Sequence, residues 1–296
     1  MRRTARTYVP ICMALCVVLA HGATPALDHC ASINPVLSCS CSATPGKAGD
    51  TCCTETYGGL LVATQLWSTF TGRESEGQVY AKNSWSIHGL WPDFCNGSYT
   101  QYCDLSRQYD PKPSPNTTDS KPGGVPVPPY TGEPIDAWFA PHGKLSLLFS
   151  MNKHWPPNSS PHDDLFTFFE TVLRWHRTLP TFQWLLDAGI HPSNTTSYTY
   201  AAIQAALTRT LDGQRRPPAF IGCGGPRFNE TLRGRGSLDS GRTELNEIWY
   251  YFHVRGRPQR GEGRRVHAGD AGGRLTTCAM AKGAVRYLQR TEGSEK

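Results

Sequence analysis

Residues 83–95 read NSWSIHGLWPDFC, and this stretch decides both the fold and the candidate site. An alternating apolar run leads to a histidine, and a Gly-Leu-Trp-Pro turn and a cysteine follow it. Alternation is typical of a strand, so we expect a strand to end near Ser86 and Ile87 and to deliver His88 to its terminus. Imidazole exchanges protons near neutral pH, so His88 is a candidate for acid–base chemistry; packing beside Trp91 is the alternative.

Polar and aromatic residues close to His88 favour a nucleobase as the ligand. Trp91 and Asp93 follow within the same stretch, and Tyr99 comes shortly afterwards. A base binds by stacking on an aromatic ring and by hydrogen bonds from polar groups to its edge. These three residues are therefore candidates for binding RNA.

The rest of the chain predicts interleaved strands and helices. Apolar runs at residues 59–67 (GLLVATQLW) and 248–254 (IWYYFHV) predict buried strands. A helix is expected from the capping pair at residues 163–164, because apolar residues follow at helical spacing. A second helix is expected over residues 200–211, ending at the Asp-Gly of 212–213. Without a regular β-α-β order, the class is α+β.

Composition indicates a secreted chain with one large domain. The 296 residues begin with three arginines, an apolar run and small residues, which predicts a signal peptide over residues 1–23. Removing those arginines from the 30 Lys and Arg leaves 27 against 24 Asp and Glu, so the net charge falls from +6 to +3. We expect one domain over residues 24–290, a proline-rich loop at 110–134 and a polar tail at 291–296. So weak a charge excludes a long electrostatic footprint for DNA.

Cysteines and sequons fit an oxidising compartment. Nine of the eleven cysteines follow the expected signal peptide, and their spacing does not match a zinc site, so we expect disulfides, no metal and no cofactor. Five Asn-x-Ser/Thr sequons predict glycosylation at Asn96, Asn116, Asn158, Asn194 and Asn229. The expected location is extracellular, or the lumen of a vacuole or lysosome, without membrane attachment.

The string Ser-Ile-His-Gly-Leu-Trp-Pro at residues 86–92 closely resembles the first active-site motif of the ribonuclease T2 family, the secreted acid ribonucleases. Further matches occur along the chain in the family's order. They include Cys52-Cys53 and Gln65-Leu66-Trp67 before this string, and Trp155-Pro156 and the strand that ends at residues 252–256 after it. The resemblance implies a disulfide-stapled α+β fold and a reaction without a metal, and we expect a monomer. It also implies single-stranded RNA as partner, cleaved to 2',3'-cyclic phosphate ends.

The resemblance assigns roles residue by residue. It gives His88 a place in the catalytic acid–base pair, Trp91, Asp93 and Tyr99 a place in one base site, and Gln65 a place in a second. It pairs Cys30 with Cys53, Cys39 with Cys95, and Cys223 with Cys278. It leaves Cys52 and Cys103 without their partners, and Cys41 is an extra.

The family's second motif, His-Glu-aromatic-x-Lys-His-Gly-Thr-Cys, is missing from the sequence. Its expected place, between Trp155-Pro156 and the helix at Asp163, holds only WPPNSSPHDD. Lys153-His154 resembles part of the motif, but Trp-Pro follows it where Gly-Thr-Cys should stand. Either the transcript has lost a segment, which the two orphaned cysteines favour, or the chain has abandoned efficient cleavage.

Other histidines and other classes of function compete with this interpretation. His162 is a free-standing alternative to the missing histidine, while the remaining histidines are expected to be surface or packing residues: His142, His176, His191, His253 and His267. A non-catalytic secreted RNA-binding or interaction protein is the alternative function. A disulfide-rich protein unrelated to RNA is disfavoured by the ordered run of matches.

Overall fold

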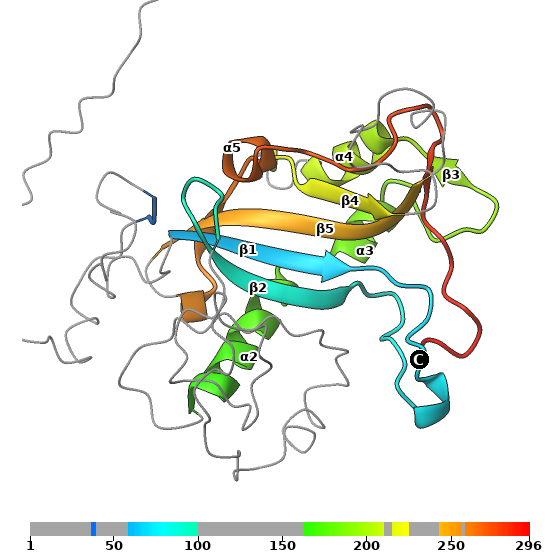
Figure 1. Cartoon of the computed structure of the whole chain (residues 1–296), viewed down its shortest axis with the longest axis horizontal. Coiled ribbons are helices and arrows are strands. Elements are labelled where there is room, and N and C mark those ends of the chain that lie inside the picture. The colour runs from blue at the N-terminus through cyan, green and yellow to red at the C-terminus, as the bar shows by residue number, and fades with distance from the viewer. Residues whose placement is uncertain (1–36, 40–58, 100–162, 210–214, 225–242, 256–257) are drawn as a thin grey trace, which may run out of the picture.

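The protein is built around a seven-stranded sheet, as a computed structural model shows for residues 37–39, 59–99, 163–209, 215–224, 243–255 and 258–296 (Figure 1). The strand order is β2-β1-β5-β7-β3, and β4 and β6 also pair with β5. The strands are β1 (Gly59–Leu66), β2 (Ser86–Phe94), β3 (Ser197–Tyr198), β4 (Phe220–Gly224), β5 (Thr243–Val254), β6 (Gly263–Val266) and β7 (Val285–Arg286). The helices are α2 (Asp163–Arg177), α3 (Thr181–Leu186), α4 (Tyr200–Thr208) and α5 (Ala268–Gly272), with 3-10 turns η2 (Glu74–Glu76) and η6 (Pro258–Arg260).

This architecture confirms the α+β class and the two central strands. All strand pairs are antiparallel except β5 with β7. The apolar runs predicted as strands form β1 and β5, and the latter starts five residues earlier than expected. Of the predicted disulfides, Cys39–Cys95 and Cys223–Cys278 are present. Cys30 and Cys53 lie outside the described residues.

Helices cover the two faces of the sheet unequally. On one face, α2, α3 and α4 pack on the larger core, which includes Trp175, Leu185 and Leu207 with the β5 residues Ile248 and Tyr250. On the other face, the short α5 packs on a smaller cluster. Two partly buried tryptophans, Trp91 and Trp249, lie against that cluster. The second face therefore carries aromatic rings that remain partly accessible.

The expected end of the second strand near Ser86 and Ile87 is wrong. The strand β2 begins at Ser86 and runs on to Phe94, through the residues interpreted as a turn. Proline cannot donate to a strand ladder and is tolerated on edge strands. Because β2 lies at the edge of the sheet, Pro92 can occupy a strand position there.

Two other boundaries also need correction. The helix expected over residues 200–211 is α4, which ends at Thr208, while residues 210–214 lie outside the described part. The segment at 291–296 is no separate tail, because the backbones of Tyr80 and Lys82 bond to those of Ser294 and Lys296. The N–H of Thr71 and the hydroxyl of Ser294 hydrogen-bond to Glu74 and lower its pKa to about 2. Polar composition alone gave no sign of this pairing.

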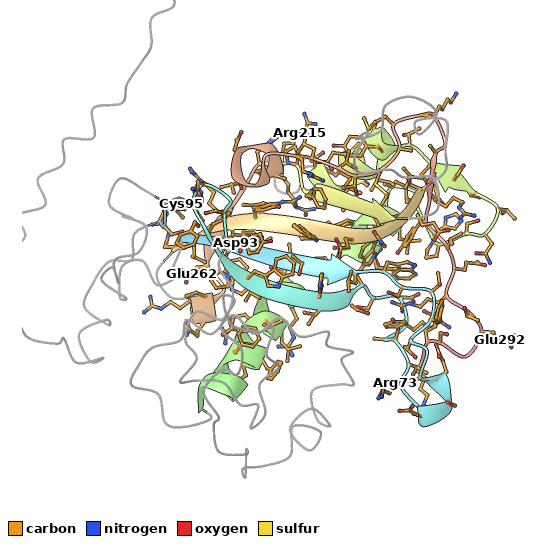
Figure 2. The ribbon with its side chains drawn as sticks, viewed as in Figure 1. Arg73, Asp93, Cys95, Arg215, Glu262 and Glu292 are labelled. Carbon is orange, nitrogen blue, oxygen red and sulfur yellow. A yellow bond between two sulfur atoms is a disulfide. The ribbon has the colours of Figure 1, made fainter. Side chains whose placement is uncertain are left out.

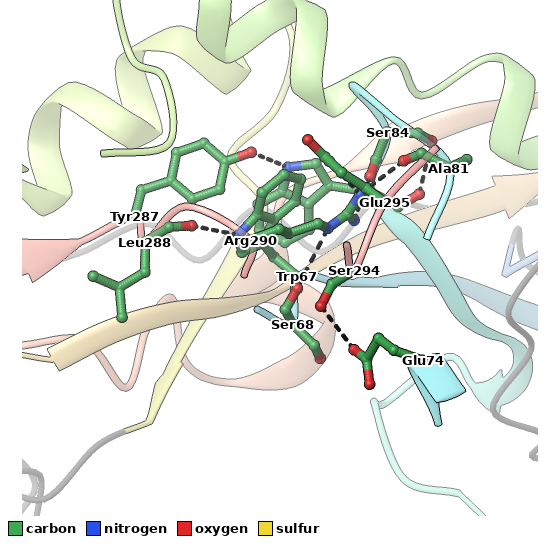
Figure 3. Close-up of polar contacts among 11 residues, drawn as sticks. Trp67, Ser68, Glu74, Ala81, Ser84, Tyr287, Leu288, Arg290, Ser294 and Glu295 are labelled. Atoms are coloured by element: carbon green, nitrogen blue, oxygen red, sulfur yellow. Dashed lines mark hydrogen bonds and ion pairs between the residues drawn. The ribbon is translucent and has the colours of Figure 1, made fainter. Parts of the chain in front are cut away.

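Arg290 fixes the same C-terminal segment to the sheet (Figure 3). Its guanidinium lies 4.1 Å from the ring centroid of Trp67 and 4.5 Å from that of Tyr80. It donates to the carbonyls of Ala81 (2.7 Å) and Ser84 (2.8 Å). Its side chain is only 1 % exposed and forms an ion pair with Glu295 at 3.2 Å. The end of the chain is thus part of the domain.

Candidate active site

A bulge in β2 positions the candidate catalytic histidine. The partners along β1 run from Thr64 with Gly89 to Gln65 with Ile87, so the register passes over His88. An unpaired bulge residue bends the strand and re-aims its side chain, and bulges are frequent beside active sites. The core side chains Ile87 and Leu90 hold the flanking backbone, while a quarter of the His88 side chain stays exposed. His88 therefore lies within a strand, near its start.

An acidic residue of β5 contacts the His88 ring. The Nδ1 atom of His88 lies 3.4 Å from Oε1 of Glu247, and the side chain of Glu247 is also about a quarter exposed. This Nδ1 atom is buried and has no hydrogen-bond partner. The two groups form an ion pair whenever His88 is protonated. Sequence reasoning missed Glu247, because strand pairing alone brings it next to a residue so distant in the chain.

Trp91 forms an aromatic row with His88 and with a second tryptophan. Its ring packs edge-on against His88 and against Trp249, with centroids 5.1 Å apart in both pairs. Phe220 extends the row at 4.9 Å from Trp249. A side chain at position 89 would meet Trp91 Nε1 at 2.3 Å, so Gly89 is what allows the indole to fold onto the strand. The sequence offered only the aromatic character of residues 248–254 as a signal for Trp249.

The predicted base-binding residues occupy different environments. Asp93 is 8 % exposed, and its burial raises its pKa to about 7. Tyr99 is 63 % exposed. Figure 2 shows Asp93 and Cys95 at one end of β2, with Arg73 at the opposite end of the sheet. Trp91 lies between His88 and Asp93 along β2.

Gln65 is buried in a hydrogen-bond network on the opposite side of the sheet. It donates to the Leu179 carbonyl at 3.0 Å and accepts from the Thr181 hydroxyl at 2.5 Å. Its Nε2 lies 3.1 Å from His176 Nδ1, and burial, together with the charge of Arg177, lowers the pKa of His176 to about 4. At 2 % exposure, Gln65 could contact a base only if this network opened. Gln65 therefore links β1 to the α2 and α3 region, and its place in a second base site stays a prediction.

The other histidines behave as packing or surface residues. His267 caps α5 by accepting from the Gly269 N–H at 3.0 Å, and His191 is exposed. Burial lowers the pKa of His253, which is half-buried on β5. His142, His162 and the Lys153-His154 pair lie outside the described residues.

Nothing in the described part of the chain resembles a metal centre, since no three His, Cys, Asp or Glu side chains gather there. Two sequon asparagines, Asn96 and Asn194, are exposed, whereas the other three are outside the described ranges.

A cavity of about 280 Å³ opens at the end of the sheet where β5 begins. Its lining includes Phe70, Asn246 and Leu288.

Comparisons with known proteins agree with this fold. The chain matches the Ribonuclease T2 family over residues 58–167 and 159–259. It is 32% identical to Ribonuclease Le2 of Lentinula edodes over 247 residues, covering 80% of this chain and 89% of that protein. It is also 32% identical to Ribonuclease Trv of Hypocrea rufa over 240 residues, covering 77% and 87% respectively.

A longer relative and a solved structure extend the comparison. A "Ribonuclease T2-like" protein of Aspergillus fumigatus is 32% identical over 251 residues, which cover 79% of this chain but 53% of that protein. The crystal structure of Actibind, a T2 ribonuclease, has the same fold, with a TM-score of 0.52 at 23% identity over 88% of this chain and 98% of that one. The chain belongs to the ribonuclease T2 family.

Proposed function

We propose that this protein is a secreted endoribonuclease that cleaves single-stranded RNA without a metal, with His88 as its surviving catalytic histidine. In the reaction, the 2'-hydroxyl oxygen attacks phosphorus and the bond from phosphorus to the 5'-oxygen breaks. The products are a 2',3'-cyclic phosphate and a free 5'-hydroxyl. The observation that carries the proposal is the partly exposed His88 beside Trp91, within a chain of this family.

The site supports a defined division of roles. Because Nδ1 of His88 faces Glu247, the other ring nitrogen is the one that can donate a proton to the leaving 5'-oxygen. Trp91 and Asp93 would bind one base, by stacking and by hydrogen bonding. The exposed ring of Tyr99 would add a second stacking surface. The exposed sequons at Asn96 and Asn194 are compatible with a secreted glycoprotein.

We further propose that this chain is a weak catalyst, because its sequence lacks the second motif. The two parts of the family match overlap at residues 159–167, and this overlap includes part of the stretch between Pro156 and Asp163 where that motif is expected. Losing one member of an acid–base pair commonly costs ~10² to 10⁴ in rate. The test compares this sequence with a version carrying the intact motif between Pro156 and Asp163, on RNA from pH 4 to 7. Equal activity of the two proteins would contradict the proposal.

The missing motif also favours a second candidate, a non-catalytic secreted RNA-binding protein that keeps the aromatic site. Binding of a single-stranded oligonucleotide, lost in Trp91→Ala without any cleavage product from the wild type, would support this candidate. The transcript across the codons for residues 156–163 distinguishes a lost segment from a genuine loss. A retained exon encoding His-Glu and Lys-His would show that a segment was lost.

A further inference from the structure

The contact between His88 and Glu247 is built by irregularities in two different strands. In β2, the pairing with β1 passes over His88. In β5, the partners along β4 run from Gly222 with Glu247 to Cys223 with Leu245, so the register passes over Asn246. Each irregularity lies at or next to one member of the pair. The two bulges therefore bring an imidazole and a carboxylate together on the face that carries Trp91.

A glycine of β4 provides the space that Glu247 occupies. A side chain at position 222 would meet Glu247 Cβ at 2.8 Å and Oε2 at 3.2 Å. The carboxylate is thus confined between β4 and the His88 ring. Trp91 also contacts that ring, packed edge-on at a centroid distance of 5.1 Å. The imidazole therefore has two neighbours, Glu247 at Nδ1 and Trp91, that limit its rotation.

We propose that Glu247 is a positioning residue for His88, which deepens the proposed function and rests on it. A carboxylate beside one ring nitrogen favours the proton on that nitrogen and thereby sets the tautomer and orientation of the imidazole. Nδ1 is buried against Glu247, so Nε2 faces the exposed side, where the phosphodiester would lie. Among the described residues, Glu247 provides the only ion pair of His88. Glu247 itself does not touch the substrate.

Alkylation of His88 by a haloacetate tests this orientation without RNA. The nitrogen that carries the lone pair attacks the methylene carbon of the haloacetate and displaces the halide, so the wild type should yield mainly the Nε2 product. In Glu247→Gln and Glu247→Ala, the share of the Nδ1 product should rise roughly threefold to tenfold, the range expected for losing a partly exposed charged contact. Peptide mapping, followed by separation of the two carboxymethylhistidine isomers, measures the ratio. The Gln variant keeps the shape of the side chain should the Ala variant fail to fold.

Glu244→Gln is the matched control, since Glu244 lies on the same strand and is also partly exposed, but pairs with Arg286. It should leave the ratio unchanged. An equal ratio in the wild type and both Glu247 variants would overturn the proposal, as would a wild type that alkylates at both nitrogens. A selective wild type that cleaves no RNA would retain this inference and refute the ribonuclease activity, so the two failures can be distinguished.

Discussion

Replacing Arg290 by Ala should destabilise the domain by roughly 3 to 5 kcal/mol. The side chain is 1 % exposed and contacts the rings of Trp67 and Tyr80. Each such cation–π contact contributes about 1 kcal/mol. The hydrogen bonds to the carbonyls of Ala81 and Ser84 are charge-assisted, and a single hydrogen bond to a charged group contributes about 1.5 to 3 kcal/mol. Because the bond to Ala81 is exposed, the two bonds together are counted as one such contribution. Removing the guanidinium also leaves these carbonyls and Glu295 without their cation.

Equilibrium unfolding in urea, followed by tryptophan fluorescence, measures this free energy. Arg290→Lys should lie between Ala and the wild type, because an ammonium keeps the charge but cannot reproduce the planar fork. Arg73→Ala is the control, since its ion pair with Glu76 has both side chains more than half exposed and should change stability by less than about 0.5 kcal/mol. A free energy of unfolding for Arg290→Ala within 1 kcal/mol of the wild type, roughly the cost of a typical mutation, would refute the reasoning.

Three further perturbations have definite expected outcomes. Replacing both Cys223 and Cys278 by Ala should lower the free energy of unfolding by about 2 to 4 kcal/mol, because their disulfide closes a loop of 55 residues. An unchanged midpoint in a thermal unfolding scan would contradict this. The folded pKa of His176, about 4, lies below the unfolded value of 6.5, so the unfolded chain binds the extra proton and stability should fall as the pH drops from about 6.5 to 4. His176→Gln should flatten this part of the pH–stability curve, and a curve identical to that of the wild type would exclude His176 as the cause. Burial raises the pKa of Asp93 from 3.8 to about 7, so the cost of burying its charged carboxylate is absent below about pH 4 and complete above about pH 7. Asp93→Asn should therefore be more stable than the wild type at pH 8 but not at pH 4, and an equal difference at both pH values would contradict this.

Local patterns in the sequence predicted the central elements well. The strand β1 is buried on both faces, so its largely apolar run was a direct signal. The helix α2 begins at the predicted capping pair. The end of β2 could not be predicted, since a proline usually interrupts a strand and only its edge position in the sheet makes Pro92 acceptable there. The burial of Gln65 depends on α2 and α3, which lie more than a hundred residues away in the chain.

The residues of the candidate site also fall into two groups, those that a local sequence pattern predicts and those that only the folded sheet brings together. His88 and Trp91 were predictable, because one local motif contains both residues. Glu247 and Trp249 were not, because they reach the site through the pairing of β5 with β4 and β1, and strand register is a property of the folded sheet. The role of residues 291–296 was hidden for a related reason. Their contacts are mainly backbone hydrogen bonds to Tyr80 and Lys82, on which side-chain composition has little influence.

The products of RNA cleavage test the central claim most directly. The wild type and His88→Ala should be incubated with a single-stranded oligonucleotide in the presence of a metal chelator, and the product ends identified by mass spectrometry. The account predicts slow release of 2',3'-cyclic phosphate ends by the wild type, reduced a further ~10² to 10⁴ in His88→Ala. Equal cleavage by the two proteins, or a wild type that binds the oligonucleotide without cutting it, would contradict the claim that His88 is a catalytic residue of this chain.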